Sequence, residues 1–227
     1  MKNFKAETIV AKLFNAVTAR VQALRDAELV VSSEFKKILE HYAPDGKHYR
    51  SFVACVETVR DVIDFEMMLK IIQKHKPAGA NDAQYMQAKT IEKVNKFIVG
   101  LGQKDFRLLD NHTRSLVVNA MLNDKRLTSR AAFASLVKVE WSEEISEVLR
   151  ARNNYTAGTG STQLSSTKEM MRTLKLSDGI KGSKNADFTF SAEAEALFVE
   201  RFEQVAKLVK TSEEISAEID ENDEIEA

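Results

Sequence analysis

Few residues in this sequence can cross-link or sharply bend the chain, which has one cysteine, two prolines and eight glycines in 227 residues. The single cysteine, Cys55, cannot form a disulfide within the chain, and its apolar neighbours are typical of a reducing compartment. No apolar run reaches the length of about 18 residues that a membrane helix needs. The charged, periodic start also lacks the apolar core of an export signal. We therefore expect a cytoplasmic protein that makes no contact with a membrane.

Motifs for catalysis, metal binding and nucleotide binding are missing as well. Gly158 and Gly160 are not followed by the lysine that a phosphate-binding loop requires. The sequence contains no Cys-x-x-Cys, His-Glu-x-x-His or Gly-x-Ser-x-Gly pattern. His41, His48 and Cys55 recur every seven residues, but a Pro-Asp-Gly turn between the histidines interrupts any helix they would share. We expect no enzymatic activity, no cofactor and no metal ion.

Charge is distributed unevenly along the chain. The net charge is -1, yet residues 211–227 contain eight acidic and no basic residues, which leaves 33 basic against 26 acidic residues, or +7, over residues 1–210. The carboxylates of this tail repel one another, and its few isoleucines cannot form a core, so we expect the tail to be disordered. Such an asymmetry between body and tail is a feature of proteins that bind nucleic acid. A smaller acidic set, Glu57, Asp61 and Asp64, is interpreted as a solvated helix face.

Apolar residues recur at helical spacing through most of the chain, which predicts a mainly α fold. One long stripe in the first 25 residues consists of Phe4, Val10, Leu13, Phe14, Val17, Val21 and Leu24. This stripe needs a partner, either the rest of the subunit or a second subunit, and we expect the chain to form a homo-oligomer. Ser191 is placed to cap a final helix, and residues 177–190 alternate weakly, as in a small β-hairpin or wing. We predict a helical N-terminal domain at 1–110, a helical C-terminal domain at 111–210 and the tail at 211–227.

Residues 150–172, RARNNYTAGTGSTQLSSTKEMMR, interrupt the helical pattern with small and polar side chains. We expect an open loop here, which ends where Ser166 and Glu169 form a capping box for a short helix. Between Ile145 and Asn185 the chain has seven basic and three acidic residues. Cations on a flexible segment, with an aromatic face for base stacking, are what sequence-tolerant single-strand binding requires. The loop is therefore predicted to bind single-stranded DNA.

Two further basic clusters, DGKHYR at 45–50 and the residues at 125–130, lie in a turn and beside a helix start. Taken singly, each of these residues also fits an ordinary solvated or packing role. The candidate nucleic-acid-binding residues are Lys47, Tyr49, Arg50, Arg126, Arg130, Arg150, Arg152, Asn153, Tyr155, Lys168, Arg172, Lys181 and Lys184.

The RARNNYTAGTGSTQ loop, the helical first half and the acidic EIDENDEIEA end resemble the small single-stranded-DNA-binding RNA polymerase cofactors of N4-type bacterial viruses. The likeness covers the chain in outline and contains no short diagnostic motif. It implies a multimeric phage protein in the host bacterial cytoplasm that binds single-stranded DNA and assists transcription or replication. The acidic tail would then contact the phage RNA polymerase. The chain departs from OB-fold single-strand binders, because it has too few alternating strands for their barrel.

Two alternatives remain open on the sequence. Residues 129–152 contain two short helical segments that could form a helix-turn-helix for duplex DNA, although the second segment begins with acidic residues that would repel phosphates. The long helices would also suit a structural or assembly protein that binds no nucleic acid.

Overall fold

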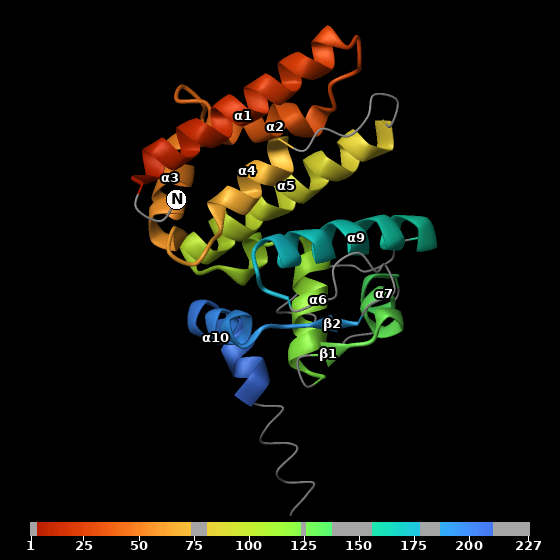
Figure 1. Ribbon diagram of the computed structural model, residues 1–227. Helices are drawn as coiled ribbons and strands as arrows, with labels where there is room; N and C mark the ends of the chain where they lie inside the picture. Colours follow the sequence, from red (N-terminus) through yellow and green to blue (C-terminus); the bar gives the residue numbers. More distant parts are fainter. Residues whose placement is uncertain (1–3, 74–80, 124–125, 138–155, 178–186, 211–227) are drawn as a thin grey trace, which may run out of the picture.

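The computed structural model describes residues 4–73, 81–123, 126–137, 156–177 and 187–210 (Figure 1). In these ranges the chain is mainly helical, and its strands form one two-stranded sheet, which confirms the predicted fold class. The acidic tail at 211–227 lies outside the described residues. No helix within the described ranges is long and apolar enough to cross a membrane.

Five helices make up the first half of the chain. They are α1 (Ala6–Asp26), α2 (Ser33–Tyr42), α3 (Tyr49–Val59), α4 (Phe65–Gln73) and α5 (Asn81–Gln103). The predicted stripe on α1 is buried against α2, α3 and α4, with Leu13 and Val17 fully buried. Phe4 is an exception, because it is 41% exposed and lies under the Lys12 ammonium, 3.8 Å from the ring centroid. The stripe therefore finds its partner within the subunit.

The second half adds short elements around a small sheet. They are the 3-10 helix η1 (Phe106–Leu108), α6 (Asn111–Met121), β1 (Arg126–Leu127), α7 (Ser129–Val137), α9 (Ala157–Thr173), β2 (Phe188–Thr189) and α10 (Ala192–Arg201). After Phe202, residues 203–210 are again helical. The predicted Ser191 cap is confirmed, since its hydroxyl accepts a hydrogen bond from the Ala194 amide.

The sheet pairs β1 and β2 in antiparallel register, with Arg126 opposite Thr189 and Leu127 opposite Phe188. A single bridge also joins Ser177 to Phe190. The predicted small β element is therefore present. Its strand β2, however, pairs with β1, which precedes α7 in the chain and does not lie within residues 177–190. Residues 178–186 are outside the described ranges.

The predicted open loop is wrong over residues 157–165, because this stretch belongs to the long helix α9, which also contains the helical residues predicted after Ser166. Thr156 is the N-cap, and its hydroxyl accepts a hydrogen bond from the Thr159 amide. Ser166 does not start a helix: it is buried in the middle of α9, and its hydroxyl donates to the Gln163 carbonyl. Glycine, serine and threonine have low helix propensity, but packing against α5 and α7 outweighs that preference here.

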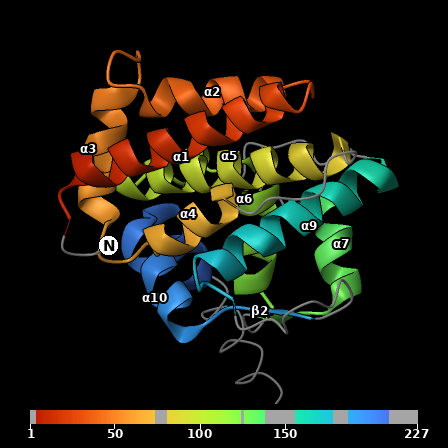
Figure 2. The same ribbon diagram turned by 45° about the horizontal axis from the view of Figure 1, so that its top comes forward.

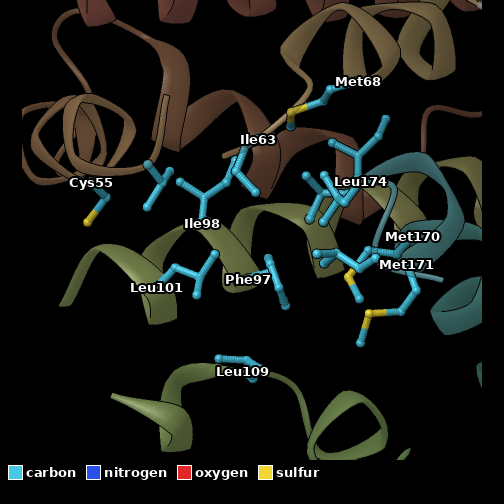
Figure 3. Packing of buried hydrophobic residues seen from close by; sticks show 14 of the residues in the cluster. Cys55, Ile63, Met68, Phe97, Ile98, Leu101, Leu109, Met170, Met171 and Leu174 are labelled. Carbon is cyan, nitrogen blue, oxygen red and sulfur yellow. The ribbon is translucent and has the colours of Figure 1, made fainter. Parts of the chain in front are cut away.

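The hydrophobic core is one continuous cluster that extends from Ala6 to Val205. Figure 3 shows Phe97, Ile98 and Leu101 of α5 at its centre, with Ile63 on one side and Met171 on another. Aromatic rings continue it toward the C-terminus, because Phe198 packs edge-on against Phe97 with ring centroids 5.8 Å apart. The division into domains at residue 110 stays a prediction.

Gly102 allows α5 to approach α3 closely. A Cβ atom added at Gly102 would lie 2.7 Å from the Cβ and 2.8 Å from the Cα of Cys55. We expect Gly102→Ala to lower the free energy of unfolding by about 1–3 kcal/mol, because the backbone of α3 must move. The matched control is Gly158→Ala in α9, where the added Cβ would meet nothing within 4 Å and helix propensity favours alanine. Urea unfolding of both variants checks this, and equal destabilisation by the two would contradict it.

Candidate nucleic-acid interface

The thirteen predicted binding residues do not form one surface among the described residues. Six of them lie outside the described ranges: Arg150, Arg152, Asn153, Tyr155, Lys181 and Lys184. The remaining seven are divided between the α2–α3 turn, the β1–α7 region and α9. Figures 1 and 2 both place the α2–α3 turn at the opposite end of the molecule from β1 and α7.

In the α2–α3 turn, Lys47 and Arg50 are exposed, as a phosphate-binding role requires. Tyr49 is the first residue of α3, and its half-buried ring packs against the hydrophobic core. It therefore presents little free ring surface to a base. The nearby turn also brings the His41 and His48 rings into a stack with centroids 5.1 Å apart, although the interrupted helix gave no reason to expect this.

Most of the predicted cations near the sheet and on α9 have carboxylate partners. Arg126 forms an ion pair with Asp187 at 2.7 Å, and Arg172 pairs with Glu169 one turn earlier in α9. Lys168 is half-buried, and burial lowers the pKa of its ammonium while the charge of Asp187 opposes that shift. Arg130 is exposed on α7. Arg126, Lys168 and Arg172 thus share two carboxylates, and Arg130 adds one exposed cation.

A polar cleft of about 440 Å³ lies instead where α5, η1, the start of α6 and α9 meet. Its volume is within the range of small-ligand sites, roughly 300–1,000 Å³. Among the described residues, its lining includes five lysines and arginines and two carboxylates. The lining residues are Lys89, Glu92, Lys93, Lys96, Arg107, Leu108, Leu109, Asp110, Asn111, His112, Arg114 and Gln163. None of the predicted binding residues is among them.

The floor of the polar cleft is a buried ion pair between α5 and the start of α6. Lys93 Nζ lies 2.8 Å from Asp110 Oδ1, and the two side chains are 4% and 9% exposed. The same ammonium donates to Thr167 Oγ1 of α9 at 2.9 Å. Lys93 therefore joins the three helices that enclose the cleft.

Asp110 also serves as the N-cap of α6. Its carboxylate accepts hydrogen bonds from the His112 and Thr113 amides and from the Thr113 hydroxyl. Burial alone would raise the pKa of Asp110, but the charge of Lys93 and these hydrogen bonds hold it well below its usual range. The carboxylate is thus ionised at neutral pH and fixes the Lys93 ammonium in place.

The rim of the cleft presents cations that remain partly in water. Lys96 is 46% exposed and pairs with Glu92 at 3.0 Å, and Arg107 is 47% exposed and pairs with Asp105 at 2.8 Å. Exposed pairs of this kind contribute about 0–1 kcal/mol, so an incoming phosphate can compete for such cations. Arg114 lies deeper in the cleft, where its guanidinium donates hydrogen bonds to the Arg107 carbonyl and to the Asn111 side chain.

Part of the signal for this cleft is in the sequence, although none of the predicted binding residues lies in it. Lys89, Lys93 and Lys96 recur at helical spacing, which places them on one side of α5. The residues Asp110-Asn-His-Thr113 also have the form of a helix start. The sequence does not show that α9 brings Gln163 and Thr167 next to the lysines of α5 and the start of α6.

No family model, no curated protein and no solved structure matches the chain. In the part of the chain that the structure describes, no three His, Cys, Asp or Glu side chains are grouped to hold a metal ion. The helix-turn-helix alternative needs residues 138–152, which are outside the described ranges.

Proposed function

We propose that the chain binds single-stranded DNA and that the polar cleft binds phosphate groups of the strand. The observation that supports this most is the set of five lysines and arginines in the lining, against two carboxylates there and two more, Glu34 and Asp105, that pair with Lys89 and Arg107 from outside it. Phosphate contacts supply most of the affinity in sequence-tolerant binding, and they need cations without a fixed base-reading pattern. Leu108, which is 37% exposed beside Arg107, adds apolar surface that a base can cover.

The exposed and the buried cations of the cleft would have different roles. Arg107 and Lys96 on the rim reach water and would exchange Asp105 and Glu92 for phosphate oxygens. Lys93 is too deeply buried to contact the phosphates of a strand. It would instead preserve the shape of the cleft by linking α5, α6 and α9. The exposed Arg130 of α7 and the segment 150–155 before α9 would extend the contact with the strand. A strand that also reached Lys47 and Arg50 would have to cross the molecule, because the α2–α3 turn lies at the opposite end from α7.

Other parts of the proposal rest on the sequence alone. They are a role as a cofactor in phage transcription or replication, a contact of tail 211–227 with the phage RNA polymerase, a homo-oligomeric state and a place in the host cytoplasm. The buried stripe of α1 gives the oligomer no support, because that stripe is covered within the subunit. An oligomer would have to use another surface.

The test measures binding of a labelled single-stranded oligonucleotide by fluorescence anisotropy over a range of salt concentrations. We expect Lys96→Gln with Arg107→Gln to weaken binding and to flatten the salt dependence, with a slope reduced by about 0.7 for each phosphate contact that is lost. The control is Arg25→Gln with Lys207→Gln, which removes the same charge from exposed positions outside the cleft. Equal slopes for the two double variants would exclude the cleft as the binding site, and no binding by the unaltered chain would refute the function.

A further inference from the structure

A second groove, of about 720 Å³, lies on another part of the molecule. It is formed by the α3–α4 connection at residues 61–66, the segment 174–176 after α9, and the start of α10 at Ser191, Glu193 and Leu197. These segments are far apart in sequence, and Figure 2 shows α4, the C-terminal end of α9 and α10 beside one another. We call this the acidic groove.

The walls of the acidic groove are apolar. Ile63, Phe65, Leu174 and Leu176 are each at most 4% exposed, which makes these walls part of the folded core. Val62 differs from them, because it is 41% exposed and extends the apolar surface to the edge of the groove. These core side chains lie beneath the groove and offer little surface, so Val62 is the apolar side chain that an incoming residue would contact most.

The edge of the groove is strongly acidic. Among the described residues, four carboxylates and one cation line it: Asp61, Asp64, Glu66 and Glu193, with Lys175. The N-terminal ammonium lowers the pKa of Glu66, so this carboxylate already has a countercharge. Lys175 Nζ lies 3.4 Å from Asp64 Oδ2 and its side chain is 76% exposed, so this pair is loose. Because residues 1–210 carry a charge of +7, an acidic edge of this kind stands out from the rest of the body.

Helix capping accounts for part of this charge but not for all of it. Asp64 caps α4 by accepting hydrogen bonds from the Glu66 and Met67 amides, and Glu193 lies in the first turn of α10. Asp61 lies before that cap and is exposed. The carboxylates thus surround the apolar groove from two helix starts and from the turn that precedes one of them.

We propose that the acidic groove is a docking site for a partner protein, and that it takes a short segment with an apolar anchor side chain flanked by lysine or arginine. Val62 offers the anchor an apolar contact at the edge of the groove, and the carboxylates complement the flanking cations. The carboxylates repel a nucleic acid strand, and they repel the chain's own acidic tail, whose charge has the same sign. This proposal does not depend on single-stranded DNA binding, because the two sites share no residue.

The test uses the full chain and a short fluorescein-labelled peptide with a central Leu-Phe pair flanked on both sides by lysine and arginine. We expect saturable binding at about 0.15 M salt, where the screening length is about 8 Å. A peptide with glutamate flanks and the same anchor should not bind, and a basic peptide with serine in place of the anchor should bind much more weakly. Equal binding of the three peptides would overturn the proposal.

Variants of the chain locate the site. Asp61→Asn with Glu193→Gln should weaken binding of the basic apolar peptide about three- to tenfold, as expected for the loss of two exposed ionic contacts. The matched control is Glu28→Gln with Asp45→Asn, which removes the same charge from exposed positions that do not line the groove.

Two results would overturn the docking proposal. The first is equal affinity of the groove variant and the control variant for the peptide. The second is that light scattering shows a dimer for the unaltered chain and a monomer for the groove variant, because a second copy of the chain would then occupy the groove. Oligonucleotide binding by the groove variant should match that of the control, which separates this test from that of the polar cleft.

Discussion

Replacing Lys93 with alanine is expected to lower the free energy of unfolding by about 3–5 kcal/mol, because it leaves Asp110 buried without its countercharge. Asp110 is 9% exposed and lies 2.8 Å from the Lys93 ammonium, so only a small part of the carboxylate faces the water of the cleft that would have to replace the missing partner. The loss also removes the hydrogen bond to Thr167 that joins α5 to α9. Urea unfolding at neutral pH measures the effect.

Two comparisons separate the ion pair from the rest of the side chain. Lys96→Ala removes an exposed lysine from the same helix and should change the free energy of unfolding by less than about 1 kcal/mol. Lys93→Met with Asp110→Asn removes both charges and keeps an N-capping side chain, so it should recover most of the stability lost in Lys93→Ala. A loss below about 1 kcal/mol in Lys93→Ala would show that the pair is not buried as described.

The same pair predicts how stability depends on pH. The pKa of Asp110 is lower in the folded chain than in the unfolded chain, where aspartate has a pKa of about 3.9. Its contribution to stability is therefore fully present well above that value and is lost as the pH falls below it, because the unfolded state binds the proton more tightly. Asp110→Asn should show a weaker loss of stability between neutral pH and acid than the unaltered chain.

The sequence predicted elements whose own residues determine them. The stripe of α1 and the Ser191 cap of α10 depend on local spacing and on one side-chain hydrogen bond, and both are found in the structure. The first part of helix α9, residues 157–165, was missed because the buried side of the helix is made partly of Gly160, Ser166 and Thr167, which carry no apolar periodicity. Small residues of this kind become helix-packing residues only when a neighbouring helix is present, and α5 is that neighbour.

The candidate site could not be predicted as a whole for a related reason. The sequence analysis looked for basic residues that are close together along the chain, and the structure shows that Arg126 and Arg172 already have carboxylate partners. The polar cleft takes its residues from α5, η1, α6 and α9. The charge pattern on α5 is visible in the sequence, but the contact between Lys93 and Thr167 depends on tertiary packing.

Phe198→Ala is expected to lower the free energy of unfolding by about 3–5 kcal/mol, because it empties a fully buried position in the aromatic part of the core. The ring of Phe198 has three aromatic neighbours: Phe97 of α5 at 5.8 Å, Phe190 between β2 and α10 at 5.2 Å, and Phe202, the C-cap of α10, at 6.0 Å between ring centroids. Relaxation of the neighbours cannot fill this space easily, since they are held by different segments of the chain. The control is Val199→Ala, the next residue in α10, whose side chain is 37% exposed and whose loss should cost less than about 1 kcal/mol.

The same variant distinguishes one cooperative core from two separate domains. Phe198 of the C-terminal half packs on Phe97 of the N-terminal half, so in a single cooperative unit the substitution lowers hydrogen-exchange protection in α1 and α5 as well as in α10. In a chain that divides into independent domains at residue 110, amides in α1 keep their protection while those of α10 lose it. Native-state hydrogen exchange resolved by residue measures both, and the continuous cluster of buried side chains from Ala6 to Val205 favours the first outcome.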